Sequence, residues 1–200
     1  MYPFRPFQTR DLPTLVARMR ADPFAVVVAV DARNRPVVSH TPALVSDDGT
    51  IRFHLARANP LADALAAAPR ATLVFTGPHD YISPLSYGTP DKVGTWNYVS
   101  VEAEGPVSVM DDGAMLRFLD DLSATFEAGP APWTRKQVSP VIIDRLLPHT
   151  VGYTLAPSRL EGTTKLGQDK TAAEREGAAS ALDAASGGAH PLAAMMRSLG

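Results

Sequence analysis

The stretch Asp47-Asp48-Gly49-Thr50 is the turn from which the fold can be worked out. An Asp-Gly pair between two apolar runs predicts a tight β-hairpin, because Gly adopts the positive φ that such turns require. Residues 37–46 and 50–56 are the two strands of this hairpin. With Asp48 and Gly49 at its centre, the numbers of facing residues sum to about 97. This register places Ser39, His40 and Thr41 opposite Ala58, Arg57 and Ala56.

Further strands are expected on both sides of the hairpin. Residues 24–30 form an unbroken, largely β-branched apolar run, which is typical of a strand buried on both faces. Segments 71–76, 98–110 and 151–160 also have strand patterns. Most of these strands lie in the first 110 residues and are joined by hairpins rather than by alternating helices. The order therefore indicates a mainly β fold, an antiparallel barrel with peripheral helices.

Short helices are predicted around these strands. Thr9 can cap a helix whose apolar residues recur at helical spacing from Leu12, and Asn59-Pro60 can begin another over 61–68. Asp111 or Asp112 begins the clearest helix. From Lys165 the composition becomes rich in alanine and charge, and two more helices are expected there. We expect one domain over residues 1–200, with 165–200 as a helical C-terminal extension.

Composition excludes several classes of function. The net charge of -2 gives no overall attraction to nucleic acid or to an anionic membrane. Without cysteine there is no disulfide, thiolate chemistry or cysteine-based zinc site, and the five histidines lack the spacing of metal ligands, so no metal is expected. The sequence has neither a membrane-spanning apolar run nor a signal-peptide pattern, which predicts a soluble, cytoplasmic protein.

Two stretches are candidates for a binding site. Arg57 comes just before the helix start at Pro60, and a helix N-terminus with an adjacent guanidinium suits a phosphate. A surface arginine beside an ordinary capped helix is the alternative interpretation. The second stretch begins at Gly77 as a long loop, in which His79, Tyr81 and Ser83 alternate. With Trp96 and Asn97 it could hold a flat polar ring, or it could be a rigid loop without a ligand.

Several separated motifs, in order, resemble the PaiB family of FMN-binding split-barrel proteins, whose members are often described as negative transcriptional regulators. The motifs are Met1-Tyr2-Pro3, Ser39-His40-Thr41-Pro42, His54-Leu55-Ala56-Arg57-Ala58-Asn59-Pro60, Gly77-Pro78-His79-Asp80-Tyr81-Ile82-Ser83-Pro84, Thr95-Trp96-Asn97-Tyr98 and Lys165-Leu166-Gly167-Gln168-Asp169-Lys170. The resemblance implies a six-stranded split barrel of the pyridoxamine-phosphate-oxidase type. It also implies a homodimer with FMN at the subunit interface.

The resemblance also implies which residues bind FMN. Arg57, Asn59 and Pro60 would hold the phosphate, while Ser39, His40 and Thr41, together with the neighbouring Ala56, would line the rest of the cofactor. The site would be closed, from the same subunit or its partner, by His79, Tyr81, Ser83, Trp96 and Asn97. Lys165 and Gln168 would reach the phosphate or the ring edge.

Two departures from the family pattern stand out. Leu85-Ser86 replaces the usual Ser-Trp, and Gly167 and Asp169 replace Ser and Asn in the final motif. The first would change what stacks over the flavin, and the second would add negative charge.

Two functions remain open from the sequence. One is flavin-dependent redox chemistry on a small molecule, with His40 and His79 as candidate proton donors because imidazole titrates near neutral pH. The other is a transcriptional regulator that uses FMN as a structural or sensing cofactor. The sequence has no helix-turn-helix pattern, so direct DNA binding is not supported by a motif.

Overall fold

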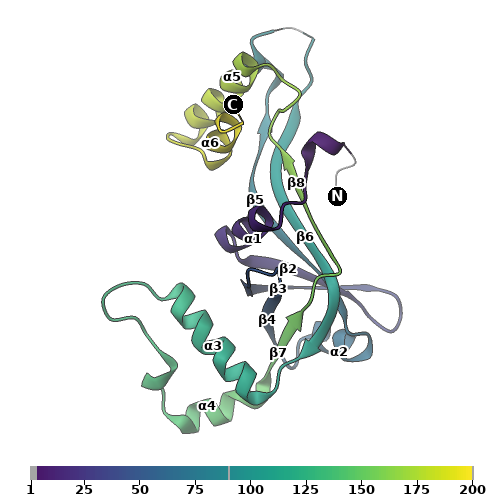
Figure 1. The fold of residues 1–200 in the computed structure, drawn as a ribbon, viewed down its shortest axis with the longest axis vertical. Coiled ribbons are helices and arrows are strands. Elements are labelled where there is room, and N and C mark those ends of the chain that lie inside the picture. The colour runs from purple at the N-terminus through teal and green to yellow at the C-terminus, as the bar shows by residue number, and fades with distance from the viewer. Residues whose placement is uncertain (1–3, 90, 200) are drawn as a thin grey trace. The chain divides into compact units, whose positions relative to one another are not determined.

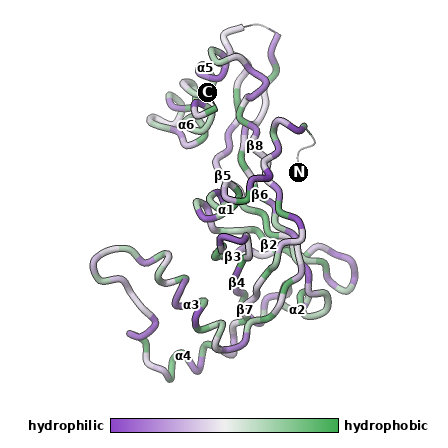
Figure 2. Tube along the Cα trace, viewed as in Figure 1, coloured by the Kyte–Doolittle hydropathy of each residue, from purple (hydrophilic) through white to green (hydrophobic). Residues whose placement is uncertain are grey.

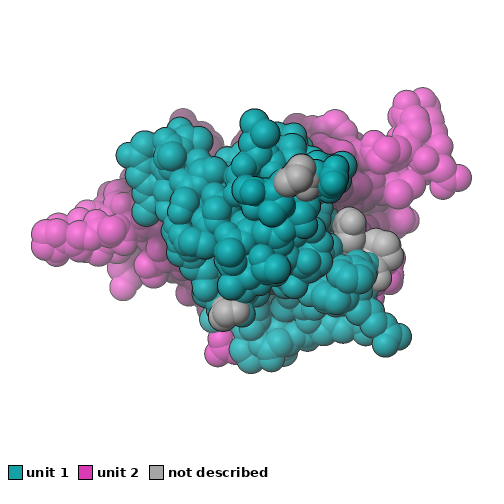
Figure 3. Space-filling model, turned by 90° about the horizontal axis from the view of Figure 1, so that it is seen from above, with its two compact units in different colours: residues 1–21, 76–102, 161–200 teal, residues 22–75, 103–160 magenta. Residues whose placement is uncertain are grey.

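The computed structural model describes residues 4–89 and 91–199 and divides into two compact units. Unit 1 comprises residues 1–21, 76–102 and 161–200, and unit 2 comprises 22–75 and 103–160 (Figures 1 and 3). Strands β5 (Arg70–Ile82), β6 (Thr95–Val109) and β8 (Arg159–Lys165) each begin in one unit and end in the other. The motif Met1-Tyr2-Pro3 lies outside the described residues.

Unit 2 contains a closed ring of antiparallel strands. β2 (Phe24–Val30) pairs with β5 on one side and with β3 (Pro36–Val45) on the other. β3 pairs with β4 (Ile51–Ala56), β4 with β7 (Thr150–Leu155), and β7 with β6. Because β6 is also a neighbour of β5, the ring closes. The fold is thus mainly antiparallel β-sheet with helices, of the split-barrel type, as the sequence predicted.

The β3–β4 turn differs in detail from the predicted one. The Ser46 N–H donates to Thr50 O at 2.9 Å, and Gly49 has a φ of 83°. The loop therefore contains three residues, with glycine in the left-handed position, instead of two. As a result Leu44 faces Arg52 and Val45 faces Ile51, one residue away from the predicted register. The expected pairing of His40 with Arg57 is therefore wrong.

β2 is buried on one face only, which corrects the expectation of two-sided burial. Ala25, Val27 and Ala29 point into the barrel, whereas Phe24 and Val30 are exposed. The strand is nevertheless hydrophobic along its whole length, as Figure 2 shows. The inner residues join a core with Phe53 and Tyr153, among others, whose rings stack at 5.3 Å.

The helices of unit 2 begin at the caps that the sequence indicates. α2 (Pro60–Ala67) starts after Asn59, and α3 (Asp112–Phe126) starts after Asp111, whose carboxylate accepts from the Ala114 N–H at 2.6 Å. The short elements η3 (Arg135–Gln137), α4 (Pro140–Leu146) and η4 (Leu147–His149) follow. The single strand expected over 151–160 is instead β7 and the start of β8.

Unit 1 begins with η1 (Arg5–Phe7), β1 (Gln8–Thr9) and α1 (Leu12–Ala21). Thr9 does not cap α1. It lies on β1 opposite Gly162 of β8, and the first turn of α1 is capped by Asp11, which accepts from the Thr14 N–H at 3.0 Å. The cap therefore lies two residues later than predicted. Thr9 pairs with β8 instead, which is a tertiary contact that no local sequence pattern reveals.

The predicted loop beginning at Gly77 is shorter than expected, because strands occupy both of its ends. β5 continues to Ile82, η2 (Pro84–Tyr87) follows, and β6 begins at Thr95. His79, Tyr81, Trp96 and Asn97 therefore lie on strands. Gly and Pro at positions 77 and 78 weaken the local strand pattern, but β5, which is hydrogen-bonded to β6, continues through them to Ile82.

The C-terminal segment of unit 1 folds as a helical hairpin of α5 (Ala172–Ser186) and α6 (Pro191–Arg197). Its buried residues include Ala179, Leu182, Leu192 and Met196, which pack with Ile82 and Val99 of the long strands. The two helices expected after Lys165 are thus confirmed, and α6 rests on α5 and the long strands. No helix in the described part of the chain is long and apolar enough to cross a membrane.

Candidate functional site: a capped helix start and an aromatic shelf

In unit 2 the start of α2 is a polar group built by Asn59 and Ser39. The Asn59 Oδ1 accepts from the Leu61 N–H at 2.9 Å, and Nδ2 donates to Ser39 Oγ at 2.9 Å. This arrangement fixes the orientation of the amide, since its oxygen faces the helix and its nitrogen faces β3. Pro60 occupies the first helical turn. The prediction that Ser39 lies beside the start of α2 is confirmed, although the predicted β3–β4 register was off by one residue.

Arg57 lies before the same helix but is turned toward β7. Its Nε donates to Pro148 O at 2.8 Å and its Nη2 donates to Thr150 O at 3.3 Å. Both acceptors are carbonyls, so no carboxylate neutralises the guanidinium in these bonds. The cation is anchored two residues from the helix cap, and the neighbouring Ala56 is exposed and faces Thr150.

The segment Ser39-His40-Thr41 divides between two faces of β3. Thr41 is 3% exposed and donates to His54 O at 2.8 Å inside the barrel. His40 is on the outer face, where its ring stacks on Phe24 at 6.0 Å. Adjacent strand residues point in opposite directions, so the three cannot line one surface. Of the three, only Ser39 contacts Asn59. The structure therefore does not place all three residues on one surface.

In unit 1 three aromatic rings form a shelf on β5 and β6, which we define as His79, Tyr81 and Trp96. The Trp96 ring lies 6.4 Å from His79 and 6.2 Å from Tyr81, between centroids. Trp96 is 54% exposed and Tyr81 48%, so both offer a surface for stacking. His79 and Tyr81 are two apart on one strand and therefore share a face, as the sequence predicted.

Two local contacts fix the rings of the aromatic shelf. The His79 Nδ1 lies 3.0 Å from Gly77 O, and since a carbonyl only accepts, Nδ1 carries the hydrogen. In the neutral ring this leaves Nε2 as the acceptor. A Cβ at Gly94 would lie 1.9 Å from the Tyr81 hydroxyl oxygen, so the missing side chain makes room for this ring.

Other predicted residues have structural contacts. Asn97 is 1% exposed and its Nδ2 faces Met196 Sδ at 3.7 Å, beneath α6. Ser83 caps η2 by accepting from the Leu85 N–H at 3.3 Å. Gln168 folds back on its own turn, accepting from the Leu166 N–H at 2.8 Å and donating to Thr164 O at 2.5 Å. None of these three joins the aromatic shelf.

Lys165 ends β8 and donates to Thr95 Oγ1, one residue from Trp96. Burial lowers the pKa of its ammonium group, and the nearby Asp169 opposes that change. Asp169 itself contacts Lys170. Asp169, which stands where the family pattern has asparagine, therefore has a neighbouring cation, Lys170, within its own turn.

Sequence reasoning missed one polar cluster, formed by Arg18, Thr9 and Thr164. The short strand β1 and the last strand β8 create it, and neither has a clear local pattern. The described residues contain no group of three or more His, Cys, Asp or Glu placed to hold a metal ion.

FMN requires an anion site for its phosphate, hydrogen-bonding groups for its ribityl chain and a flat surface for its ring. Each unit taken by itself offers part of this chemistry. In unit 2 the α2 start supplies oriented N–H groups with Ser39 and Asn59, and in unit 1 the aromatic shelf supplies exposed planar rings with Lys165 nearby.

Comparison with known proteins identifies the family. Residues 1–159 match the family described as "Putative FMN-binding domain". The chain is 27% identical over 153 residues to the Bacillus subtilis protein named Protease synthase and sporulation protein PAI 2, covering 74% of this chain and 72% of that one. It is 29% identical over 220 residues to an uncharacterized Aspergillus fumigatus protein, covering 83% and 84%.

Solved structures share the fold. A FAD and heme binding protein from Mycobacterium smegmatis aligns with a TM-score of 0.61 at 21% identity, over 84% of this chain and 78% of that one. The flavocytochrome Anf3 from Azotobacter vinelandii aligns with a TM-score of 0.62 at 18% identity, over 84% and 73%. The fold and the family model define a flavin-binding split-barrel protein. The chain belongs to the FMN-binding family that includes PaiB, and FMN is its cofactor.

Proposed function

We propose that this protein carries out flavin-dependent redox chemistry on a small molecule. The observation that carries the proposal is the exposed aromatic shelf of His79, Tyr81 and Trp96, because open planar rings suit a stacked flavin that a small reactant can reach. When bound, FMN supplies the redox chemistry. A nicotinamide or other small donor loses two electrons, and a small acceptor or oxygen gains them.

His79 is the proton-handling candidate of the aromatic shelf. Its Nδ1–H donates to Gly77 O, which orients the ring and leaves Nε2 available to take up or deliver a proton. His40, the other candidate, stacks on Phe24. On this evidence we favour His79, since its contact fixes both the tautomer and the ring orientation.

Turnover by the FMN-loaded protein tests the proposal. We expect a yellow flavin spectrum and oxidation of NADH or NADPH in air, with slower turnover in His79→Gln. A colourless protein that takes up no FMN would contradict the family assignment itself. A yellow protein that oxidises neither donor, nor reduces any acceptor offered, would contradict the redox proposal alone.

A regulatory role is the second candidate, favoured by similarity to the Bacillus subtilis protein whose name refers to protease synthesis and sporulation. In that role FMN would be structural or would sense the redox state. Salt-dependent mobility-shift assays with promoter DNA separate the two candidates. Sequence-selective DNA binding without turnover would favour the regulator.

The aromatic shelf predicts which tryptophan binds FMN. The chain has two tryptophans, Trp96 on the shelf and Trp133 in the segment before η3, and both are substantially exposed. Trp96→Leu should weaken FMN binding about fivefold, because ring stacking contributes about 1 kcal/mol beyond buried area. Trp133→Leu is the matched control and should leave affinity unchanged. Equal affinities for the two variants, measured by titration, would remove Trp96 from the site.

We further propose that the protein is a homodimer with FMN at the subunit interface, in which the outer face of β2 and β3 packs against a second copy. Phe24 is 59% exposed, Val30 49% and Val38 54%, and the register places Val28 opposite Val38 and Val30 opposite Pro36. An apolar sheet face of this kind usually marks an interaction surface. The unbroken apolar run of β2 is the pattern of a strand covered on both sides, which a second copy would provide.

A charge on this face should dissociate the proposed dimer. Val38→Glu would bury a carboxylate between the copies, a cost of several kcal/mol, so we expect a monomer in sedimentation velocity and loss of FMN on gel filtration. Val109→Glu, at a 66% exposed position on β6, is the control and should remain dimeric. A dimer that persists in Val38→Glu would contradict this interface, and a monomeric wild type would contradict the dimer.

A further inference from the structure

Arg18 is a half-buried cation whose neighbours are neutral. Its Nη1 donates to Thr164 Oγ1 at 2.5 Å and to Thr9 Oγ1 at 3.2 Å. The two hydroxyl oxygens lie 2.6 Å apart, so one hydroxyl donates to the other. Thr164 is 8% exposed, which places this cluster at the edge of the packed interior of unit 1.

Close packing between α1 and β8 builds the cluster. A Cβ at Gly162 would lie 2.6 Å from Leu15 Cδ2, so the glycine lets the helix approach the strand. Arg18 follows Leu15 by one helical turn, and Thr164 follows Gly162 on the same strand face. β1 then adds Thr9 through its pairing with Gly162. Two consecutive elements near the N-terminus, β1 and α1, and the distant strand β8 thus fix the position of the guanidinium.

Arg18 differs in charge environment from Arg135 and Arg197. Arg197 pairs with Glu176 and Asp183, and Arg135 pairs with Asp120, and these carboxylates raise the pKa of each guanidinium. Within residues 4–89 and 91–199 no carboxylate pairs with Arg18, and burial alone lowers its pKa. A partly desolvated cation without a counter-charge is unfavourable, and an anionic ligand would relieve that cost.

The donors of this cluster suit an oxyanion. A guanidinium has five N–H groups in a planar fork, which matches two oxygens of one carboxylate or phosphate. The bonds to Thr9 and Thr164 both come from Nη1. One hydrogen is shared between the two hydroxyls, and the second hydroxyl hydrogen can be donated to a ligand.

We propose that Arg18, Thr9 and Thr164 form an oxyanion-binding site for a phosphate or carboxylate group of a small molecule. Arg18 would hold two oxygens of the ligand through its free edge, and a threonine hydroxyl would donate to one of them. The FMN assignment uses none of these three residues. The proposal is therefore independent of which residues hold the FMN phosphate, and it gives the protein a second place for an anionic reactant or effector.

Thermal unfolding of the FMN-loaded protein, at constant ionic strength, tests the site. Inorganic phosphate and malonate, a dicarboxylate, are titrated separately, so that a phosphate ligand can be distinguished from a carboxylate ligand. We expect at least one of them to raise Tm of the wild type in a saturable way. In Arg18→Gln the apparent affinity should fall about tenfold to a hundredfold, since hydrogen bonds to charged groups are lost.

Two variants control for charge and for shape. Arg20→Gln removes an exposed arginine of the same helix and should leave the anion effect unchanged. Thr164→Val keeps the side-chain shape and should weaken the effect without changing flavin absorbance; it also provides a test if Arg18→Gln fails to fold.

Two outcomes would overturn the proposal. One is a wild type that responds to neither anion beyond a matched chloride control. The other is the same response in Arg18→Gln and Arg20→Gln. Flavin absorbance is recorded on every sample. If the Arg18→Gln variant retains FMN but loses the anion effect, the anion site is separate from the FMN site. If the variant also loses FMN, a separate site is contradicted. A failure of the redox proposal leaves these readouts unchanged.

Discussion

Asn59 combines two contacts in one side chain, and it connects helix stability with the proposed phosphate position. Its oxygen caps α2 and its nitrogen holds Ser39. Asn59→Ala removes both bonds and should lower the free energy of unfolding by about 1 kcal/mol, a typical value for an N-cap. Ser139→Ala is the matched control, because Ser139 precedes α4 without a side-chain cap bond and should have little effect. Chemical denaturation measures both, and equal losses would contradict the capping role.

Asn59→Asp separates the cap from the phosphate. Aspartate still caps the helix, and the Ser39 hydroxyl can donate to its second oxygen in place of the bond from Nδ2, so stability should be nearly unchanged. The charge of aspartate would, however, repel a phosphate at the same N–H groups. We expect FMN affinity to fall by about tenfold. Unchanged affinity would show that the phosphate lies elsewhere.

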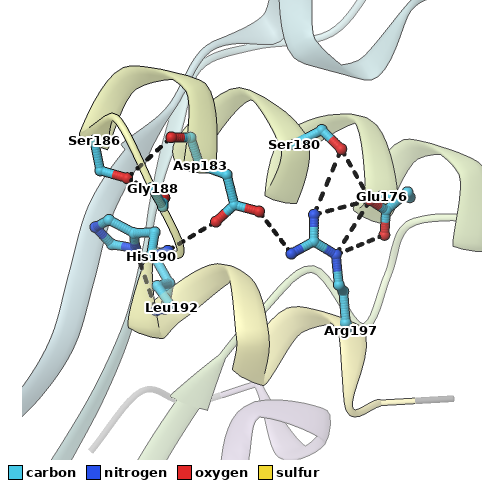
Figure 4. Close-up of polar contacts among 8 residues, drawn as sticks. All are labelled: Glu176, Ser180, Asp183, Ser186, Gly188, His190, Leu192 and Arg197. Carbon is cyan, nitrogen blue, oxygen red and sulfur yellow. Dashed lines mark hydrogen bonds and ion pairs between the residues drawn. The ribbon is translucent and has the colours of Figure 1, made fainter.

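At the scale of elements, the C-terminal hairpin is held by a polar clasp that Figure 4 shows, formed by Arg197, Glu176 and Asp183. Arg197 Nη2 lies 2.9 Å from Glu176 Oε1, and Nη1 lies 2.7 Å from Asp183 Oδ2. Asp183 also accepts from the His190 N–H at 2.7 Å, which closes the turn before α6. One α6 side chain therefore joins two positions on α5.

Arg197→Met should release α6 while the rest of the protein stays folded. These groups are exposed, so we expect a local effect: faster amide exchange in residues 190–199, with little change in the barrel strands. Arg197 lowers the pKa of Glu176, and the His190 N–H together with Arg197 lowers the pKa of Asp183. Their contribution is therefore fully present above the ordinary carboxylate pKa and is lost as pH falls through the lowered values. Exchange in α6 that is the same in the variant and the wild type at neutral pH would contradict the clasp.

At the scale of the whole molecule, the barrel was predictable because the sequence signals for its strands and turns are local. β2, the Asp48-Gly49 turn and the caps at Asn59 and Asp111 are each set by residues close in sequence. The aromatic shelf was partly predictable, since His79 and Tyr81 alternate along one strand. The loop was predicted to begin too early, because Gly77 and Pro78 resemble a break, whereas β5 continues through them to Ile82. The burial of Asn97 could not be predicted from the sequence, because it results from the packing of α6, which lies about a hundred residues further along the chain.

The sequence by itself determined the mainly β fold class, the helix starts and the FMN-binding family, because turn chemistry, capping and ordered motifs act over a few residues. The tertiary structure alone decided which polar side chains meet. It brought Ser39 to Asn59, separated His40 from Thr41 across β3, and turned Arg57 toward the carbonyls of Pro148 and Thr150. It also brought Thr164 of β8 to Thr9 and Arg18 near the N-terminus. Contacts of that kind depend on strand register and on helix packing, and a change of one residue in register moves a side chain to the other face of a sheet.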